Sequence, residues 1–146
     1  MMSIAGRNVL IVEDEYWLAE EMATTVRSYG GHVLGPYDDM NVREPLHEID
    51  VAILDINLGY REALGHNEHV FPLAFALHEA LIPFIFVTGY QAHSEIIPTK
   101  LRHVRLLTKP VPKLCEVIKT LLQAEEAYYE YDIQQITDSL LKENAA

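Results

Sequence analysis

Four short runs of mostly apolar residues, each followed at once by polar side chains, constrain this chain more than any other feature of its sequence. The runs are Val9–Val12, Val51–Leu54, Phe84–Val87 and Val104–Leu107. Unbroken apolar runs of this length are typical of strands that are buried on both faces of a parallel sheet. A further, weaker strand is predicted over His32–Gly35.

Helical patterns separate these predicted strands. Apolar side chains recur at helical spacing in three segments, with stripes at Leu18, Met22 and Val26, at Val70, Leu73, Ala74, Leu77 and Leu81, and at Leu114, Val117, Ile118, Leu121 and Leu122. A weak helix is predicted over Val42–Ile49, although Pro45 limits its extent. Strands that alternate with helices predict an α/β domain, a doubly wound parallel sheet with crossover helices on both faces.

Length and charge narrow the class of protein. The 146 residues fit one domain of ordinary size, and 49% of them are hydrophobic, which is enough for a core. The formal net charge of −11 gives no attraction to nucleic acid. No apolar run approaches the length of a membrane span, and the N-terminus lacks a hydrophobic signal core. With one cysteine, Cys115, which we expect to be half-buried, these features favour a cytoplasmic protein.

The last part of the chain differs from the rest. Residues 125–146 contain six acids and one lysine, with apolar side chains at helical spacing at Tyr129, Ile133, Ile136 and Leu140. We interpret this segment as a further amphipathic helix, an acidic extension (125–146) that follows the main domain (1–124). Two uses remain open, because the helix either packs on its own domain or contacts a partner or a second copy of the chain.

Polar residues follow the strands at the edge where parallel sheets bind ligands. Glu13, Asp14, Asp55, Thr88 and Lys109 each come directly after a predicted strand or close to its end. The carboxyl ends of parallel strands meet at one edge, so these side chains are expected to converge there. Three carboxylates without histidine or cysteine suit Mg²⁺ better than Zn²⁺. A carboxylate nucleophile, a lysine and a hydroxyl are also the groups that phosphoryl transfer needs.

The order Glu13-Asp14, Asp55, Thr88 and Lys109-Pro110 resembles the receiver domains of response regulators in two-component signalling. The resemblance covers about residues 7–124 and is specific. It implies a flavodoxin-like fold, a five-stranded parallel sheet of order 2-1-3-4-5 flanked by five helices. It also implies that Asp55 is the residue that becomes phosphorylated.

The same resemblance implies roles for the other residues of this edge. Asp14 would bind Mg²⁺ directly, Glu13 would act mainly through metal-bound water, and the backbone carbonyl of Asn57 would supply a further ligand beside Asp55. Thr88 and Lys109 would bind the phosphoryl group and couple it to a protein-binding surface.

A narrower resemblance is also visible. Asp55–Gly59 and Pro83–Tyr90 are similar to a subgroup of single-domain receivers with a Phe-Ala-Thr-Gly-aromatic signature, which is known mainly from alphaproteobacteria. Val87 stands where that signature has alanine. Membership in this subgroup is a finer hypothesis than membership in the family.

Two features depart from the family pattern. Leu106 occupies the position, three residues before the lysine, where many receivers have an aromatic switch residue. Tyr90 is a candidate to replace part of that role. The stretch Tyr60–Glu68 is longer than usual and borders the site, so we expect it to affect access to Asp55.

Three functions are compatible with these residues. The first is a stand-alone receiver that takes a phosphoryl group from a histidine kinase or histidine phosphotransfer protein and acts through protein contacts, with autocatalytic phosphotransfer and autodephosphorylation as its only chemistry. The second is an interaction module that does not depend on phosphorylation. The third is a small Mg²⁺-dependent aspartyl phosphohydrolase, which is disfavoured because Asn57 stands where such enzymes carry a proton-donating aspartate. Expected partners are a kinase or phosphotransfer protein, a downstream protein and a second copy of the chain.

Overall fold

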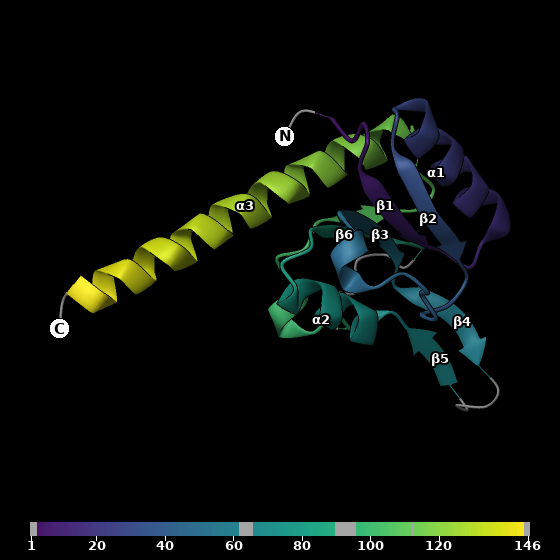
Figure 1. The fold of residues 1–146 in the computed structure, drawn as a ribbon. Coiled ribbons are helices and arrows are strands. Elements are labelled where there is room, and N and C mark those ends of the chain that lie inside the picture. Colours follow the sequence, from purple (N-terminus) through teal and green to yellow (C-terminus); the bar gives the residue numbers. More distant parts are fainter. Residues whose placement is uncertain (1–2, 62–65, 90–95, 112, 145–146) are drawn as a thin grey trace.

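A five-stranded parallel sheet forms the centre of the protein, as described by a computed structural model for residues 3–61, 66–89, 96–111 and 113–144 (Figure 1). Its strands lie in the order β2-β1-β3-β6-β7. Their bounds are Asn8–Val12 for β1, His32–Tyr37 for β2, Val51–Asp55 for β3, Phe84–Thr88 for β6 and Leu106–Thr108 for β7. Counted along the chain within this sheet, the order is 2-1-3-4-5, which confirms the predicted topology.

The central strands are apolar on both faces because both faces are covered. All five residues of β3 and all five of β6 are buried. The pairing of Asp55 with Val87 and of Thr88 with Thr108 brings the ends of β3, β6 and β7 to one edge of the sheet. The last strand begins at Leu106 rather than at Val104, because the N–H of Val104 is bonded to the carbonyl of Leu101 in a preceding turn.

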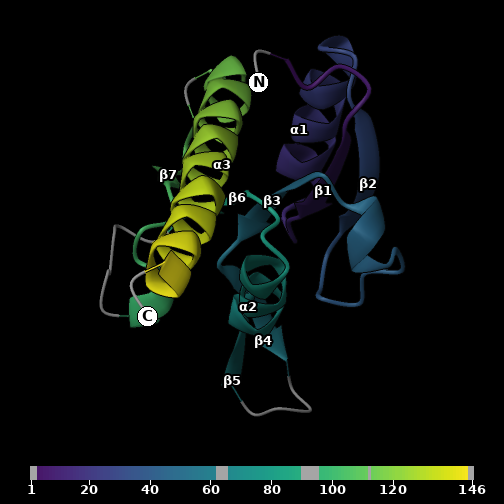
Figure 2. The same ribbon diagram turned by 60° about the vertical axis from the view of Figure 1, so that its left-hand side comes forward.

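Three α-helices are present among the described residues: α1 (Tyr16–Ser28), α2 (Phe71–Glu79) and α3 (Cys115–Asn144). Figures 1 and 2 show α1 and α2 on opposite sides of the sheet. The apolar face of α1 and the first turns of α3 pack with one face of the sheet in one buried cluster. Ala74 and Leu77 of α2 belong to a second cluster on the other face. The sheet therefore separates two apolar cores.

Two of the five expected flanking helices differ from the prediction. The segment Val42–Ile49 forms only the 3-10 helix η1 (Leu46–Glu48), because Pro45 before it has extended backbone angles. Between β6 and β7 the described residues contain the 3-10 helix η3 (Thr99–Leu101), which also follows a proline, Pro98. Residues 90–95 of this connection lie outside the described residues.

A small antiparallel pair of strands, which the sequence analysis did not predict, follows β3. It consists of β4 (Asn57–Arg61) and β5 (His66–His69), which form a separate two-stranded sheet. The pair contains most of the stretch that was noted as unusually long. Its sequence is polar and short, so it carries neither the apolar alternation nor the length by which a strand is normally recognised.

The predicted fifth helix and the predicted acidic extension form one continuous helix, α3. Figure 1 shows its C-terminal half projecting beyond the body of the protein. The helix packs on the domain as far as Tyr128, which is 8% exposed, whereas Tyr129 is 68% exposed. Cys115 is exposed at the first residue of α3, not half-buried as expected. Among the helices of the described ranges, none combines the length and apolar character needed to cross a bilayer.

Candidate functional site

Three carboxylates converge at the carboxyl ends of the central strands, as the sequence predicted. Glu13 and Asp14 follow β1, and Asp55 is the last residue of the adjacent strand β3. One oxygen from each of the three side chains lies within 4.8 Å of the others. The parallel register of β1 and β3 produces this arrangement, because it brings both strands to the same edge.

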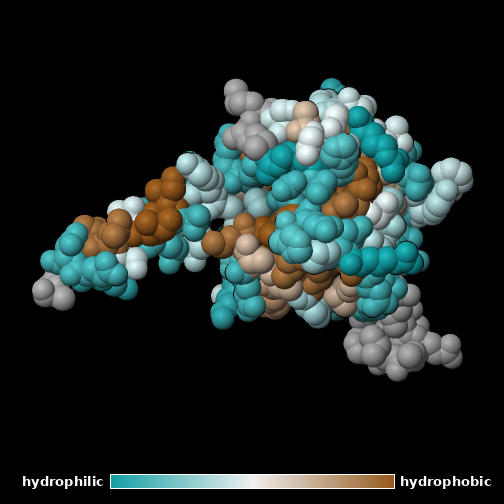
Figure 3. Space-filling view, in the orientation of Figure 1, coloured by the Kyte–Doolittle hydropathy of each residue, from teal (hydrophilic) through white to brown (hydrophobic). Residues whose placement is uncertain are grey.

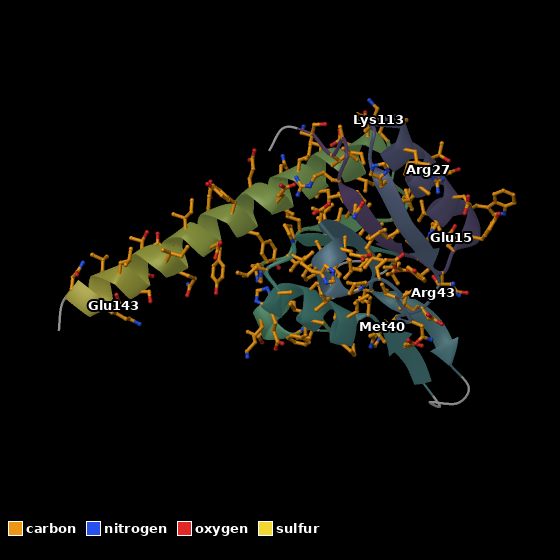
Figure 4. All side chains as sticks on the ribbon, viewed as in Figure 1. Glu15, Arg27, Met40, Arg43, Lys113 and Glu143 are labelled. Atoms are coloured by element: carbon orange, nitrogen blue, oxygen red, sulfur yellow. The ribbon has the colours of Figure 1, made fainter. Side chains whose placement is uncertain are left out.

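Lys109 joins the same cluster from the end of β7. Its ammonium Nζ lies 2.5 Å from Oε1 of Glu13 and 3.3 Å from Oδ2 of Asp55. Glu15 adds a fourth carboxylate at 3.8 Å from Nζ and is labelled near the start of α1 in Figure 4. Glu15 was not predicted as a site residue, because it follows two other acids in the sequence and no pattern distinguishes it from them.

Thr88 lies at the same edge of the sheet. It is the last residue of β6 and only 1% exposed. Its backbone carbonyl accepts a hydrogen bond of 2.8 Å from the N–H of Lys109. This backbone hydrogen bond therefore holds Thr88 and Lys109 next to each other at the ends of β6 and β7.

Burial changes the acid–base properties of Asp55. The side chain is enclosed, with only 3% of the residue exposed, and burial is the main reason why its pKa rises from 3.8 to about 7. Glu13 raises the pKa further, because protonated Asp55 can share its proton with Glu13 and because two negative charges repel. The ammonium of Lys109 lowers the pKa but does not cancel these effects.

Burial and neighbouring charges also shift the pKa values of Asp14 and Lys109. The pKa of Asp14 is raised, first by burial and then by hydrogen bonding with Asp55 and by its charge. Burial lowers the pKa of Lys109, but the hydrogen bond to Glu13 and the charges of Asp55 and Glu13 outweigh it, so the net shift is upward. The raised pKa of Lys109 favours its cationic form, while the raised pKa values of Asp55 and Asp14 disfavour their charged forms.

The cluster has the features of a site for a hard divalent cation. Glu13 is 2% exposed, and its Oε2 is buried without a hydrogen-bond donor. Three carboxylates face one lysine at short range, which leaves negative charge uncompensated. Within the described part of the chain the cluster contains no histidine or cysteine. Oxygen-only donors of this kind fit Mg²⁺ or Ca²⁺.

The turn after β3 rests against these acids. The N–H of Asn57 donates to Oδ1 of Asp55 at 3.3 Å, and the side chain of Asn57 accepts a bond of 3.2 Å from the N–H of Gly59. Gly59 has a φ of +83°, and a Cβ there would lie 3.1 Å from Oδ2 of Asp14. The proposed metal contact of the Asn57 carbonyl stays a prediction. Gly59 is a site residue that sequence reasoning missed.

The residues that depart from the family pattern lie in two different places. Leu106 begins β7 and is half-buried, in contact with the apolar cluster that also contains α2. Its aliphatic side chain packs where the family pattern places an aromatic ring. Tyr90, the candidate replacement, lies outside the described residues.

Comparison with known proteins adds to this geometry. The sequence matches no protein-family model and no curated protein. Among solved structures the chain is similar to the non-phosphorylated HemR receiver domain from Leptospira biflexa, with 20% identity and a TM-score of 0.65 over 82% of this chain and 94% of that chain.

Two further structures show the same similarity. SdrG from Sphingomonas melonis Fr1 is 29% identical, with a TM-score of 0.60 over 83% of this chain and 99% of that chain. A response regulator protein from Burkholderia pseudomallei, solved with a phosphorylated aspartic acid, a calcium ion and citrate, is 18% identical, with a TM-score of 0.61 over 96% of this chain and 87% of that chain. These similarities establish a shared fold.

Proposed function

We propose that this chain, which has the receiver-domain fold of response regulators, accepts a phosphoryl group on Asp55 and passes on a signal through protein contacts. The observation that carries the proposal is the cluster at the strand ends, where Asp55 lies with Glu13 and Asp14 and 3.3 Å from the ammonium of Lys109. A histidine kinase or a histidine phosphotransfer protein is the expected donor.

The proposed reaction is an in-line displacement at phosphorus. A carboxylate oxygen of Asp55 forms the new P–O bond, while the P–N bond to the donor histidine breaks and its electron pair stays on the imidazole, which then takes up a proton. Asp55 is the nucleophile we favour, because it lies on the central strand between the acids after β1 and the lysine after β7. Glu13 is the closer partner of Lys109, with 2.5 Å from Nζ to its Oε1 against 3.3 Å to Oδ2 of Asp55.

The other residues of the cluster would position and neutralise the phosphoryl group. A divalent cation, Mg²⁺ in our proposal, would be held by Asp14, Asp55 and the carbonyl of Asn57, with Glu13 acting mainly through metal-bound water, and would supply positive charge to the phosphoryl oxygens. The Lys109 ammonium is close enough to move from Asp55 to a phosphoryl oxygen. The Thr88 hydroxyl would donate to another oxygen.

This chemistry requires no separate substrate site. Autocatalytic phosphorylation and slow hydrolysis of the aspartyl phosphate would be the only reactions. A dedicated phosphohydrolase needs a general acid after the nucleophile, but an amide cannot transfer a proton, and the side chain of Asn57 is bonded to the N–H of Gly59. We also propose a cytoplasmic location, where kinases and phosphotransfer proteins of this class act.

Incubation of the purified protein with a small phosphodonor and Mg²⁺ tests the proposal. We expect a mass gain of one phosphoryl group that is labile in base, and we expect it to vanish without the metal. Asp55→Asn is the main variant, and Asp50→Asn, which changes an acid outside the cluster, is the matched control that should still be phosphorylated.

Each alternative has its own outcome in this experiment. Sustained phosphate release over many turnovers would replace the proposal with a phosphohydrolase. An unmodified Asp55 under conditions that phosphorylate another receiver domain would contradict the proposal and favour an interaction module that is independent of phosphorylation.

A further inference from the structure

The projecting half of α3 carries a stripe of apolar side chains that its own domain does not cover. The space-filling view shows apolar patches along this part of the helix (Figure 3). The exposed fractions are 68% for Tyr129, 47% for Ile133, 55% for Ile136, 54% for Leu140 and 62% for Leu141. Tyr131 is 48% exposed on the same half, and six large apolar side chains at this exposure on one helix are typical of an interaction surface.

The spacing of the stripe fits a helix partner. Tyr129, Ile133, Ile136 and Leu140 are separated by four, three and four residues, which is the alternation of the a and d positions of a coiled coil. The stripe spans less than two heptads. A helix pair of that length is marginal by itself, so the partner must also bury surface elsewhere.

A second surface lies at the base of the same projecting half. A cavity of about 1030 Å³ is lined by residues of α2, β6, the segment before β7 and α3, including Tyr131. Lys100 and Arg105 supply cationic side chains to its wall, His103 is beside them, and Glu79 is the one acid there among the described residues. The cavity therefore combines an apolar lining with positive charge.

The two surfaces have complementary charge. From residue 129 to the C-terminus the chain has four acids, Glu130, Asp132, Asp138 and Glu143, and one lysine. Figure 4 labels Glu143 near the tip of α3. An acidic, apolar helix and a basic, apolar cavity at its base are what two copies need in order to contact each other reciprocally, because a two-fold interface must be self-complementary.

We propose that two copies of this chain associate through antiparallel α3 helices, so that each apolar stripe packs against the other and each acidic tip lies at the partner's cavity. A parallel pair would instead place the two Glu143 side chains beside each other, because Glu143 occupies the next position of the stripe after Leu140. The proposal is independent of phosphorylation at Asp55.

Sedimentation velocity of the full chain over a range of concentrations tests the association. We expect a reversible dimer in the micromolar range. Ile136→Asp should weaken it at least tenfold, because a charge would enter the stripe. Gln135→Asp adds the same charge one residue away, off the stripe, and should change the dissociation constant less than twofold. Both positions are exposed, so circular dichroism should show the same helix content in both variants.

Two results would overturn the association. One is a wild-type chain that stays monomeric at every concentration up to the solubility limit, since the stripe would then serve another partner. The other is an equal effect of Ile136→Asp and Gln135→Asp on the dimer.

Disulfide cross-linking tests the direction of the helices in a Cys115→Ser background. We expect Tyr129→Cys protein to cross-link with Leu140→Cys protein and not with itself, because stripes that pack against each other in antiparallel fashion bring these two positions together. Cross-linking of Tyr129→Cys protein with itself would indicate parallel helices and overturn the arrangement.

Charge reversal tests the role of the cavity. Lys100→Glu with Arg105→Glu should weaken the dimer several-fold, and adding Asp138→Lys with Glu143→Lys should restore part of the loss. A dimer that is indifferent to all four changes would contradict the contact between tip and cavity.

Discussion

Asp55 experiences two opposing effects, burial beside Glu13, which favours its neutral form, and the nearby Lys109, which favours its charge. The first effect is larger, so its pKa rises to about 7. A carboxylate held near neutrality without a cation becomes fully ionised when a cation enters. Binding of a divalent cation should therefore release protons and relieve an unfavourable interaction at the same time.

The raised pKa makes a prediction about pH and stability in metal-free protein. Between pH 4 and 7 folded Asp55 holds a proton that unfolded Asp55, with an ordinary pKa of 3.8, has released. The folded state binds more protons, so the free energy of unfolding should fall as pH rises through this window. Chemical denaturation with a chelator present should show the slope, and it should be much smaller in Asp55→Asn.

Metal addition supplies the control for this prediction. At pH 8, Mg²⁺ should raise the unfolding free energy of the wild type and have little effect on Asp55→Asn. If the stability of the two metal-free proteins has the same dependence on pH, the assignment of the raised pKa to Asp55 is wrong.

Replacing Lys109 should lower the free energy of unfolding, because Glu13 and Asp55 are buried and Lys109 is the cation beside them. Lys109→Met keeps the aliphatic length but leaves Glu13 and Asp55 without their cation, and we expect a loss of about 3 kcal/mol at pH 8 without metal. The loss should shrink at pH 5, where Asp55 is protonated. Lys119→Met, on the exposed surface of α3, should change stability by less than about 0.5 kcal/mol. A deficit for Lys109→Met that is equal at both pH values would indicate lost packing instead of lost charge.

The sequence predicted which residues form the candidate site better than it predicted which of their side chains contact each other. Glu13, Asp14 and Asp55 were predicted to converge because each follows a strand, and strand ends in a parallel sheet share an edge. The preference of Lys109 for Glu13 over Asp55 depends on side-chain distances of 2.5 and 3.3 Å, which no sequence pattern encodes. The participation of Glu15 was missed for the same reason.

At the scale of elements, the turn between β3 and β4 supports the carboxylates of the site. Gly59→Ala should cost about 1–2 kcal/mol, because its positive φ strains a side chain, and should also displace the carboxylate of Asp14. We therefore expect weaker Mg²⁺ binding, measured by calorimetry. Gly6→Ala is the matched control, since it has a φ of +73° and nothing within 4 Å of the added Cβ.

The Gly6→Ala control separates the effect of backbone strain from the effect of displacing the Asp14 carboxylate. Both glycine variants should lose similar stability, but only Gly59→Ala should lose Mg²⁺ affinity. Equal affinity in the two variants would show that the turn does not position Asp14.

Tyr128 packs α3 against α2 and β6, on the face of the sheet opposite to α1. Its hydroxyl lies 3.0 Å from Nδ1 of His78 in α2, and its ring is 6.2 Å from that of Phe84. Burial raises the pKa of Tyr128 to about 12, so the hydroxyl stays protonated. We expect Tyr128→Phe to reduce stability by about 1 kcal/mol in thermal or chemical unfolding. Tyr129→Phe, at the exposed neighbouring position, should have no measurable effect, and an equal loss in both would rule out the contact with His78.

The strands and long helices were predicted well because burial on two faces, or on one stripe, leaves a clear periodic pattern. The segment Val42–Ile49 was less predictable, because a few apolar residues beside Pro45 do not distinguish a helix from a single turn. The pair β4–β5 was missed because backbone pairing, rather than an apolar face, defines it. The continuity of α3 was missed because the change in composition near residue 124 suggested a boundary where the backbone has none.

At the scale of the whole molecule, the two apolar cores meet at α3. Its first turns pack with α1 on one side of the sheet, while Tyr128 belongs to the cluster on the other side. Glu125, between them, forms an ion pair of 2.8 Å with Arg7. We therefore propose that the folded body ends after Tyr128, whereas the composition of the sequence places the boundary at residue 124.

Truncation tests this position. Removal of residues 133–146 should change the unfolding free energy by less than about 0.5 kcal/mol, because the described residues removed are exposed. Removal of residues 125–146 should cost about 3 kcal/mol or more, because Glu125 and Tyr128 are lost. The comparison should be made at concentrations where both proteins are monomeric, and equal stability would place the end of the body at residue 124.

Because the C-terminal half of α3 projects from the body, a small rotation of the helix at Tyr128 produces a large displacement at its far end. Asn144 lies 16 residues after Tyr128, and at about 1.5 Å per residue the free part of the helix extends roughly 24 Å beyond Tyr128. A tilt of about 5° at Tyr128 would thus move the far end by about 2 Å. Small repacking around His78 and Phe84 would be magnified at a distance, and a fluorophore or spin label near the tip would report it.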